Sequence, residues 1–167
     1  MSPKFEHVRH KPPTSLTQPR PLVIACPPLR SHVNLSRIVR LAGCCGIDRV
    51  IVCGNAKVDP KIARDGADSV QLEARRSLPP VLRKLSQEGY HLVGLEQTNR
   101  SQNLHEFKFQ HKTCLVIGSE RQGITEDVLE CLDETIEIPV WGLPYSYNVA
   151  TATTMAIYEY CRQFPEG

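Results

Sequence analysis

Three short segments of the sequence place polar side chains where a protein can bind or transform a ligand. The first, Asn34-Leu-Ser-Arg-Ile-Val-Arg40, is the start of a basic helix that follows an apolar run. An arginine can hold a phosphate through two parallel hydrogen bonds, and the N-terminus of a helix adds positive potential. A solvated helix face explains Arg37 and Arg40 at least as well. This segment alone therefore permits phosphate binding without requiring it.

The second segment, Leu115-Val-Ile-Gly-Ser-Glu-Arg-Gln-Gly-Ile124, runs from an apolar strand into a turn with two glycines and a carboxylate. Glycines at the carboxyl end of a strand let a ligand approach the backbone, and α/β sheets bind small molecules at this edge. The segment lacks the Gly-Lys-Ser/Thr of a phosphate loop and the spaced glycines of a dinucleotide site, which argues against nucleoside triphosphates and NAD. Glu120 alone is equally consistent with an ordinary turn residue.

The third segment, Ile138 to Ala152, places the polar residues Ser146 and Asn148 at the start of an apolar helix. Asn148 can simply cap that helix, because an asparagine side-chain oxygen accepts backbone N–H groups. A cap does not explain the elaborate loop before it, which contains Trp141 and Tyr145. Such a loop is typical of a binding site.

The elements that must position these segments alternate between strands and helices. Short apolar runs predict strands at Leu22–Cys26, Arg49–Cys53, Ser69–Leu72, His91–Leu95, Thr113–Ile117 and Thr135–Ile138. Helical spacing predicts helices that start at the capping residue Asn34 and at Val58–Arg64, Ser77–Glu88, Glu126–Leu132 and Asn148–Gln163. This alternation predicts an α/β fold with a mostly parallel sheet flanked by helices.

The last of these helices is rich in small residues between Ala150 and Ala156. Small side chains let another helix approach closely, so this face can contact the first helix or a second subunit. Ordinary packing within the chain explains the composition equally well.

The length and composition describe a globular protein. The 167 residues suffice for one domain, and 41% of them are hydrophobic. No apolar run approaches the roughly 20 residues of a membrane span, and the first residues lack the apolar core of a secretory signal, so we expect a cytoplasmic protein. The seven cysteines form no Cys-x-x-Cys pair or Cys/His array, which predicts reduced thiols and no metal site.

Residues 1–20 are rich in proline and lack apolar periodicity, which predicts a flexible arm ahead of one domain over residues 21–167. A loose terminus is the simpler interpretation of the arm, and an RNA-binding segment is the alternative. The net charge of +2 permits a nucleic-acid partner without demanding one. Basic residues that can face phosphates concentrate towards this end, and they are Lys4, Arg9, Lys11, Arg20, Arg30, Arg37 and Arg40.

Together and in this order, the three segments resemble the signature motifs of the SpoU (TrmH) family of SPOUT methyltransferases. The match is an asparagine followed six residues later by an arginine, then Leu-Val-x-Gly-x-Glu-x-x-Gly, then Ile-Pro-x-x-Gly-x-x-x-Ser-x-Asn-Val. The resemblance extends over roughly residues 21–162, and the combination is far more specific than any single motif. It implies an enzyme that uses S-adenosylmethionine to methylate a ribose 2′-hydroxyl in a structured RNA. The minimal domain favours transfer RNA over ribosomal RNA.

The resemblance also implies a fold that sequence physics would not propose. Members of the family thread the C-terminal stretch through a loop as a trefoil knot, although knots are among the rarest topologies. They are usually homodimers through the knot region and the C-terminal helix, with the cofactor in the knot and the RNA site shared between subunits. We therefore expect an α/β sheet with a C-terminal trefoil knot and a homodimer, with no membrane or metal partner.

By the same resemblance, the backbone around five positions would hold the cofactor, and these positions are Leu95, Glu96, Gly118, Ile138 and Tyr147. Arg40 stands at the catalytic arginine position of the family. A guanidinium with a pKa above about 12 holds its proton strongly, so we expect Arg40 to bind the phosphate beside the target ribose while a phosphate oxygen or water accepts the proton. Residues that would orient Arg40 and the ribose are Asn34, Glu120, Ser146 and Asn148. Further RNA contacts are expected from Arg30 and Arg37.

Two features depart from the common pattern of the family. Tyr147 stands where relatives usually carry leucine or methionine, and its hydroxyl can alter the cofactor pocket. Residues 1–20 are too short for the extra N-terminal RNA-binding domain of some relatives, so we expect specificity to come from the arm, the dimer surface or a helper protein. The alternatives are a knotted RNA-binding module without turnover, against which the intact motif residues argue, and an unrelated α/β enzyme that binds another nucleotide.

Overall fold

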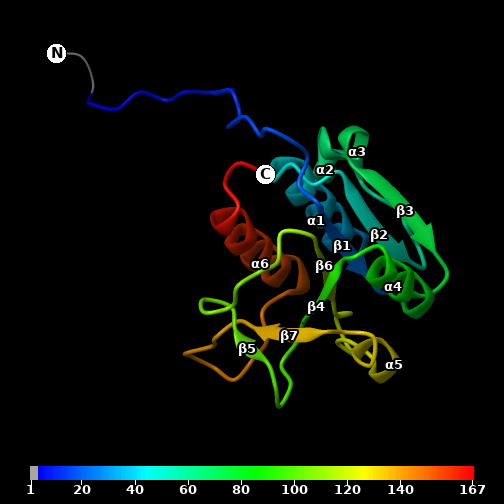
Figure 1. Cartoon of the computed structure of the whole chain (residues 1–167). Helices are drawn as coiled ribbons and strands as arrows, with labels where there is room; N and C mark the ends of the chain where they lie inside the picture. The colour runs from blue at the N-terminus through cyan, green and yellow to red at the C-terminus, as the bar shows by residue number, and fades with distance from the viewer. Residues whose placement is uncertain (1–3) are drawn as a thin grey trace.

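Seven strands form one sheet in the computed structural model, which describes residues 4–167 (Figure 1). The strands lie in the order β3-β2-β1-β6-β4-β7-β5, and every pairing between neighbours is parallel. Their bounds are β1 Leu22–Cys26, β2 Arg49–Cys53, β3 Gln71–Arg75, β4 His91–Leu95, β5 Gln102–Asn103, β6 Thr113–Ile117 and β7 Glu134–Glu137. The predicted parallel sheet is therefore confirmed.

The two central strands, β1 and β6, are buried along their whole length. A parallel strand that is covered on both faces favours an unbroken apolar run over alternation, and both strands have such a run. Ala25 pairs with Val116, and Leu95 pairs with both Ile117 and Ile136. The carboxyl ends of β1, β6, β4 and β7 consequently meet at one edge of the sheet.

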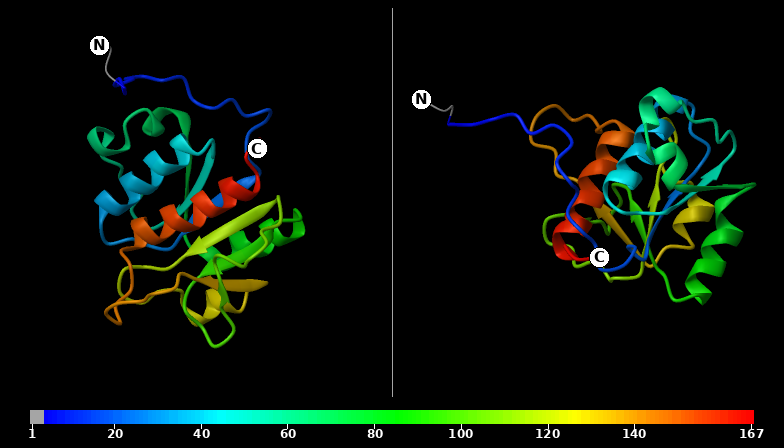
Figure 2. Two further views of the ribbon diagram at one scale, coloured as in Figure 1. Left: turned by 90° about the vertical axis from the view of Figure 1, so that its left-hand side faces the viewer. Right: turned by 90° about the horizontal axis from the view of Figure 1, so that it is seen from above.

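Helices cover both faces of the sheet over the described residues. Their bounds are α1 His32–Cys44, α2 Pro60–Ala63, α3 Gly66–Ser69, α4 Leu78–Gln87, α5 Glu126–Leu129 and α6 Val149–Gln163. The helices α1, α2, α3 and α6 lie on one face, and α4 and α5 lie on the other (Figure 2). Because strand side chains alternate between faces, Ile24 joins the apolar core under α1 and α6, whereas Val23 joins the core under α4 and α5.

The two long helices on the first face, α1 and α6, begin side by side (Figure 2). Asn148 caps α6 as predicted, since its side-chain oxygen accepts the N–H groups of Ala150 and Thr151. The expectation that Asn34 caps α1 is wrong. The cap is Ser31, which accepts the N–H of Asn34, and Asn34 lies inside the first turn with only 6% of its surface exposed. Asn34 is therefore free to use its side chain elsewhere.

Other elements differ from the sequence prediction at their ends. The strand β3 extends to Arg75, whereas the sequence predicted Ser69–Leu72, because its outer residues are exposed and carry no apolar signal. The helix α2 begins only at Pro60, and α5 ends at Leu129. The short elements α3 and β5, with 4 and 2 residues, were not predicted at all, since neither is long enough to show a period.

The N-terminal segment has no helix or strand between residues 4 and 20, and its end is attached to the domain. Thr17 hydrogen-bonds the carbonyl oxygen of Glu166, and the side chain of Leu16 lies against Gly46. The guanidinium of Arg20 is buried and donates to the carbonyl oxygens of Cys45, at 2.7 Å, and Phe164. The expectation that Arg20 faces phosphates is therefore wrong, because it ties the end of α1 to the end of α6.

Several expectations stay predictions. The threading of the C-terminal segment as a trefoil knot is one, and an RNA-binding role of the arm, whose residues 1–3 lie outside the described residues, is another. Among residues 4–167, none of the helices has the length and hydropathy of a membrane span. In the same range, no cluster of three or more His, Cys, Asp or Glu residues could hold a metal ion.

Candidate functional site

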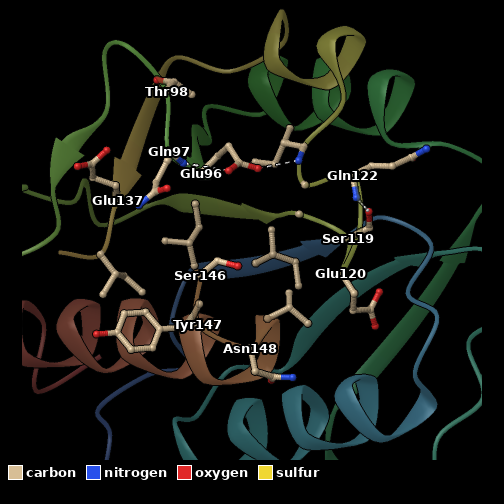
Figure 3. Close-up of a pocket in the computed structure, with 18 of the residues that line it drawn as sticks. Glu96, Gln97, Thr98, Ser119, Glu120, Gln122, Glu137, Ser146, Tyr147 and Asn148 are labelled. Carbon is tan, nitrogen blue, oxygen red and sulfur yellow. Dashed lines mark hydrogen bonds between the residues drawn. The ribbon is translucent and has the colours of Figure 1, made fainter. Parts of the chain in front are cut away.

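A cavity of about 850 Å³ opens at the carboxyl edge of the sheet (Figure 3). Three stretches of chain that follow strands β4, β6 and β7 form its walls, and the start of α6 closes the remaining side. The stretches are residues 95–99, 117–124 and 137–140, and residues 146–149 lead into α6. A cavity at the carboxyl ends of parallel strands is the usual place for a ligand in this class of fold.

The loop after β6 folds back on itself to make one wall of the cavity. Ser119 and Gly123 exchange two backbone hydrogen bonds of 3.0 and 3.2 Å. Gly123 has a φ of +63°, which favours glycine, and a Cβ there would collide with the carboxylate of Glu96. A Cβ on Gly118 would lie 2.7 Å from the Cα of Gly123. Both glycines of the second segment are therefore required by the tight loop itself.

The carboxylate of Glu96 holds this loop against the end of β4. One oxygen accepts the N–H of Ile124 at 2.9 Å, and the other accepts the N–H of Gln97 at 3.0 Å. Figure 3 shows these contacts as dashed lines beside Glu96. Glu96 lines the cavity, as expected for a cofactor-binding residue, but its carboxylate is already used to join two walls.

Glu120 links the same loop to the start of α1. Its carboxylate accepts the backbone N–H groups of Arg30, at 3.0 Å, and Ser31, at 3.1 Å. It also accepts the side-chain amide of Asn34 at 3.2 Å. Partial burial tends to raise the pKa of Glu120, but these hydrogen bonds outweigh burial and lower the pKa below its usual value. Glu120 is therefore a firmly ionised anchor rather than an ordinary turn residue.

Asn34 carries the connection on to α6. Its side-chain oxygen accepts the amide of Asn148 at 3.3 Å, while the oxygen of Asn148 caps α6. The side chains of Glu120, Asn34 and Asn148 thus form one chain of hydrogen bonds at the rim of the cavity. Each comes from a different one of the three sequence segments, which explains why these segments occur together.

The remaining residues of the predicted catalytic set are placed differently. Ser146 lines the cavity with an exposed side chain. Arg40 is exposed on α1 and does not line the cavity, because it lies about 9 Å farther along the helix axis than Asn34. Arg37 and Arg30 are also exposed and outside the cavity lining, and Arg30 contacts Glu120 only through its backbone. The structure thus brings the three network residues and Ser146 together, but not the arginines.

All five residues predicted to hold a cofactor line the cavity, namely Leu95, Glu96, Gly118, Ile138 and Tyr147. The hydroxyl of Tyr147 donates to the carbonyl oxygen of Pro139, at 3.4 Å, so it closes its own loop. Sequence reasoning missed the polar lining residues Gln97, Thr98, Asn99, Gln122 and Glu137. A polar run directly after a buried strand was the available signal for the first three of these.

The cavity combines apolar walls with a negative charge. Its lining includes three carboxylates, from Glu96, Glu120 and Glu137, against one guanidinium, from Arg121. The lining also includes the apolar residues Leu95 and Val140. Such a lining suits a ligand with an apolar or aromatic body and a net positive charge.

Comparisons with known proteins agree with this geometry. The sequence pattern of the SpoU rRNA Methylase family matches residues 21–158. The tRNA (guanosine(18)-2'-O)-methyltransferase of Escherichia coli (strain K12) is 29% identical over 133 residues, which cover 78% of this chain and 58% of that relative. The A. aeolicus TrmH/SpoU tRNA modifying enzyme has a TM-score of 0.83 and 27% identity, over 88% of this chain and 77% of that chain.

A second solved structure, the SpoU methyltransferase AviRb from Streptomyces viridochromogenes in complex with the cofactor AdoMet, has a TM-score of 0.77 and 27% identity, over 90% of this chain and 63% of that chain. This chain spans less than two thirds of the length of the E. coli relative. The family match nevertheless includes the three segments, the sheet and most of α6. The chain therefore belongs to the SpoU rRNA Methylase family.

Proposed function

We propose that this protein transfers a methyl group from S-adenosylmethionine to a ribose 2′-hydroxyl of a structured RNA. The observation that carries the proposal is the hydrogen-bond chain from Glu120 through Asn34 to Asn148 at the rim of the cavity. This chain of hydrogen bonds joins all three sequence segments at the rim. A cofactor bound in the cavity and an RNA bound outside it could meet there. The family to which the chain belongs, and the RNA methyltransferase activity in the name of its E. coli relative, support the same activity.

The cavity fits S-adenosylmethionine in size and charge. Its volume of about 850 Å³ is within the usual range for a cofactor site. The cofactor carries a sulfonium, an ammonium and a carboxylate, hence one net positive charge, which three lining carboxylates against one guanidinium complement. AviRb, which shares the fold, was crystallised with this cofactor. We propose that the backbone near Gly118, Ile138 and Tyr147 and the side chain of Leu95 hold it.

When bound, the cofactor supplies a methyl group already activated by its sulfonium, so the protein has only to align the ribose and assist proton loss. Ser146 and Asn148 line the cavity, which supports a role for their side chains in hydrogen-bonding the ribose. Glu120 and Asn34 fix the orientation of Asn148. A phosphate oxygen or water accepts the proton, since the lining has no histidine or lysine and the carboxylates of Glu96 and Glu120 are already hydrogen-bonded within the chain.

Arg40 then needs a second subunit to act at the cavity. It is exposed and outside the cavity lining of its own chain, so a homodimer with a shared RNA site would bring the Arg40 of one protomer to the cavity of its partner. Large apolar side chains near the cavity and on α6 are exposed and suit this contact: Trp141, Leu143, Tyr145 and Tyr158 are each at least 71% accessible.

Mixing two inactive variants tests the shared site. Arg40→Ala removes the arginine, and Ile138→Trp fills the cavity. If Arg40 acts on the partner's cavity, an equal mixture of the two variants regains about a quarter of the wild-type activity, because half of its dimers are mixed and each mixed dimer has one complete site of two. Light scattering should give the mass of a dimer. A monomer, or a mixture without activity, would reject the shared site but not the methyl transfer.

Transfer RNA is the proposed substrate, because the E. coli and A. aeolicus relatives are described as acting on it. The family description, which mentions ribosomal RNA, keeps that class as the alternative. A cytoplasmic location stays a prediction.

The decisive experiment uses the purified protein, S-adenosylmethionine with a labelled methyl group, and separate transfer and ribosomal RNA fractions. The labelled methyl group should enter transfer RNA at one position. The phosphodiester bond next to that ribose should resist alkaline hydrolysis, because a methylated 2′-oxygen cannot attack the adjacent phosphate. Calorimetry with S-adenosylmethionine and NAD runs in parallel. Cofactor binding without label in either RNA would indicate a binding module, and binding of NAD instead would indicate another enzyme.

A further inference from the structure

The segment between β2 and β3 lies directly against α1. The backbone N–H of Asp59 donates to the hydroxyl of Ser36 at 2.8 Å. Farther along, a Cβ on Gly66 would lie 2.8 Å from the carbonyl oxygen of Val39 and 3.2 Å from the Cα of Arg40. The backbone at Gly66 therefore lies in direct contact with the backbone of α1, and it leaves no room for a side chain. This segment therefore follows α1 towards Arg40.

Within this segment, Arg64 has an unusual backbone conformation. Its φ is 54° and its ψ is −141°, a combination that favours glycine. The N–H of Arg64 donates to the carbonyl oxygen of Pro60, and its carbonyl oxygen accepts the N–H of Ala67. Neighbouring Ala63 and Gly66 are buried, so the surrounding structure holds Arg64 in place. A glycine would be more stable here, so the arginine side chain is expected to serve a function.

The side chain of Arg64 adds to an unpaired basic surface. Arg64 is exposed two residues before Gly66, so it lies within reach of the same ligand as Arg40. Over residues 4–167, no ion pair or side-chain hydrogen bond occupies the charged groups of this surface, which are Arg37, Arg40, Lys57, Lys61 and Arg64.

Three carboxylates on the same segment only partly offset this charge. Asp59 is already used, because its side chain accepts the N–H of Lys61 at 2.9 Å and caps α2. Asp65 and Asp68 are exposed at α3. Five positive groups against three negative ones leave a positive excess beside Arg40, which suits a phosphate backbone.

We propose that Arg64 is a further RNA-binding residue whose guanidinium, together with Arg37 and Arg40, contacts the phosphates beside the target ribose. The strained backbone is retained because it places this guanidinium next to Arg40. The proposal rests on the RNA substrate proposed above and extends its contact surface from α1 to the segment between β2 and β3.

Three variants of Arg64 separate backbone strain from charge. Arg64→Gly removes both, so its melting temperature should rise by about 2–4 °C. Its dissociation constant for unfractionated transfer RNA should rise about tenfold, and the slope of log affinity against log salt should fall by about one. Arg64→Ala keeps the strain and should bind RNA as weakly as Arg64→Gly, without the gain in melting temperature. Arg64→Lys should keep the salt slope of the wild type.

The matched control is Arg83→Ala, which removes an exposed arginine from α4 on the opposite face of the sheet and should leave RNA binding unchanged. RNA binding is measured without cofactor, so its result is independent of methyl transfer. If Arg64→Gly binds RNA like the wild type, or melts at a lower temperature, the proposal is wrong. If the wild type binds transfer RNA but never methylates it, the proposed function fails while the role of Arg64 is still decided by the variants.

Discussion

The rim of the cavity and the outer surface of α1 carry charged side chains in opposite states. At the rim, the carboxylates of Glu96 and Glu120 each accept two or more hydrogen bonds within the chain. On the outer surface of α1, Arg37 and Arg40 have no side-chain partner among residues 4–167. Carboxylates that are satisfied within the chain build the site, whereas arginines without partners remain available for a ligand.

This difference predicts that changes in the two regions have different consequences. A change at the rim should alter stability and cofactor binding, because it removes contacts that the fold already makes. Replacing Arg37 or Arg40 should alter only what the protein does with RNA, because the fold makes no use of these two side chains.

The largest effect is expected at Arg40. Arg40→Ala should reduce methyl transfer at least about 100-fold, because the phosphate beside the target ribose loses its charged partner. Affinity for S-adenosylmethionine, measured by calorimetry, and the melting temperature should stay unchanged. Unchanged turnover would contradict the catalytic role of Arg40. A large loss of stability would mean that the fold does depend on this arginine, contrary to the contrast with the cavity rim.

At the rim, the largest effect on stability is expected at Gly123. Gly123→Ala should lower the free energy of unfolding by about 2–3 kcal/mol, since a Cβ is strained at positive φ and meets the Glu96 carboxylate. Urea denaturation measures the loss, and cofactor affinity should fall with it. The control is Gly142→Ala in the exposed loop, where a Cβ has no neighbour within 4 Å. Equal stability of the two variants would mean that the loop after β6 is not tightly fixed.

Much of the fold and part of the candidate site could be predicted from the sequence, and there are physical reasons why the rest could not. Unbroken apolar runs predicted the strands β1, β2, β4 and β6 with the bounds that the structure shows. Residues of the cavity lining could be predicted where they belong to the sequence motifs. Sequence reasoning could not assign the cap of α1, because Ser31 and Asn34 are both good capping residues.

The decisive partner of Asn34 is Glu120, which is 86 positions away in the sequence. Long-range contacts of this kind leave no local pattern, so the three segments were recognisable as motifs while the hydrogen bonds that join them were not. The burial of Arg20 was unpredictable for the same reason, because the carbonyl oxygen of Phe164 lies 144 positions away.

Asn148 both caps α6 and donates a hydrogen bond to Asn34, and two variants can separate these roles. Asn148→Ala removes the cap of α6 and the amide donor to Asn34, and it should cost about 1 kcal/mol of unfolding free energy. Asn148→Asp keeps a good cap but loses the amide donor, so it should retain stability while methyl transfer falls. Thermal denaturation and turnover are measured on both. If Asn148→Asp is fully active, the hydrogen bond to Asn34 has no part in catalysis.

The smallest effect is a dependence of stability on pH at Glu120. Because its pKa is lowered by folding, the ionised carboxylate contributes stability that is complete above the usual glutamate value of 4.5 and disappears as the pH falls through the lowered folded value. Melting temperatures of the wild type and Glu120→Gln should therefore differ by a constant amount at neutral pH and converge in acid. A difference that grows in acid would exclude this role of the carboxylate.

The junction of Thr17 with Glu166 brings the two extremities of the domain within hydrogen-bonding distance. A short glycine linker could fuse them, and new ends could then be opened in a surface turn such as the exposed Gly54-Asn55. Such a circular permutant would have to build the same sheet from its strands and helices in a different chain order. Its refolding rate, set against that of the natural order, would reveal how strongly chain connectivity governs the assembly of this fold.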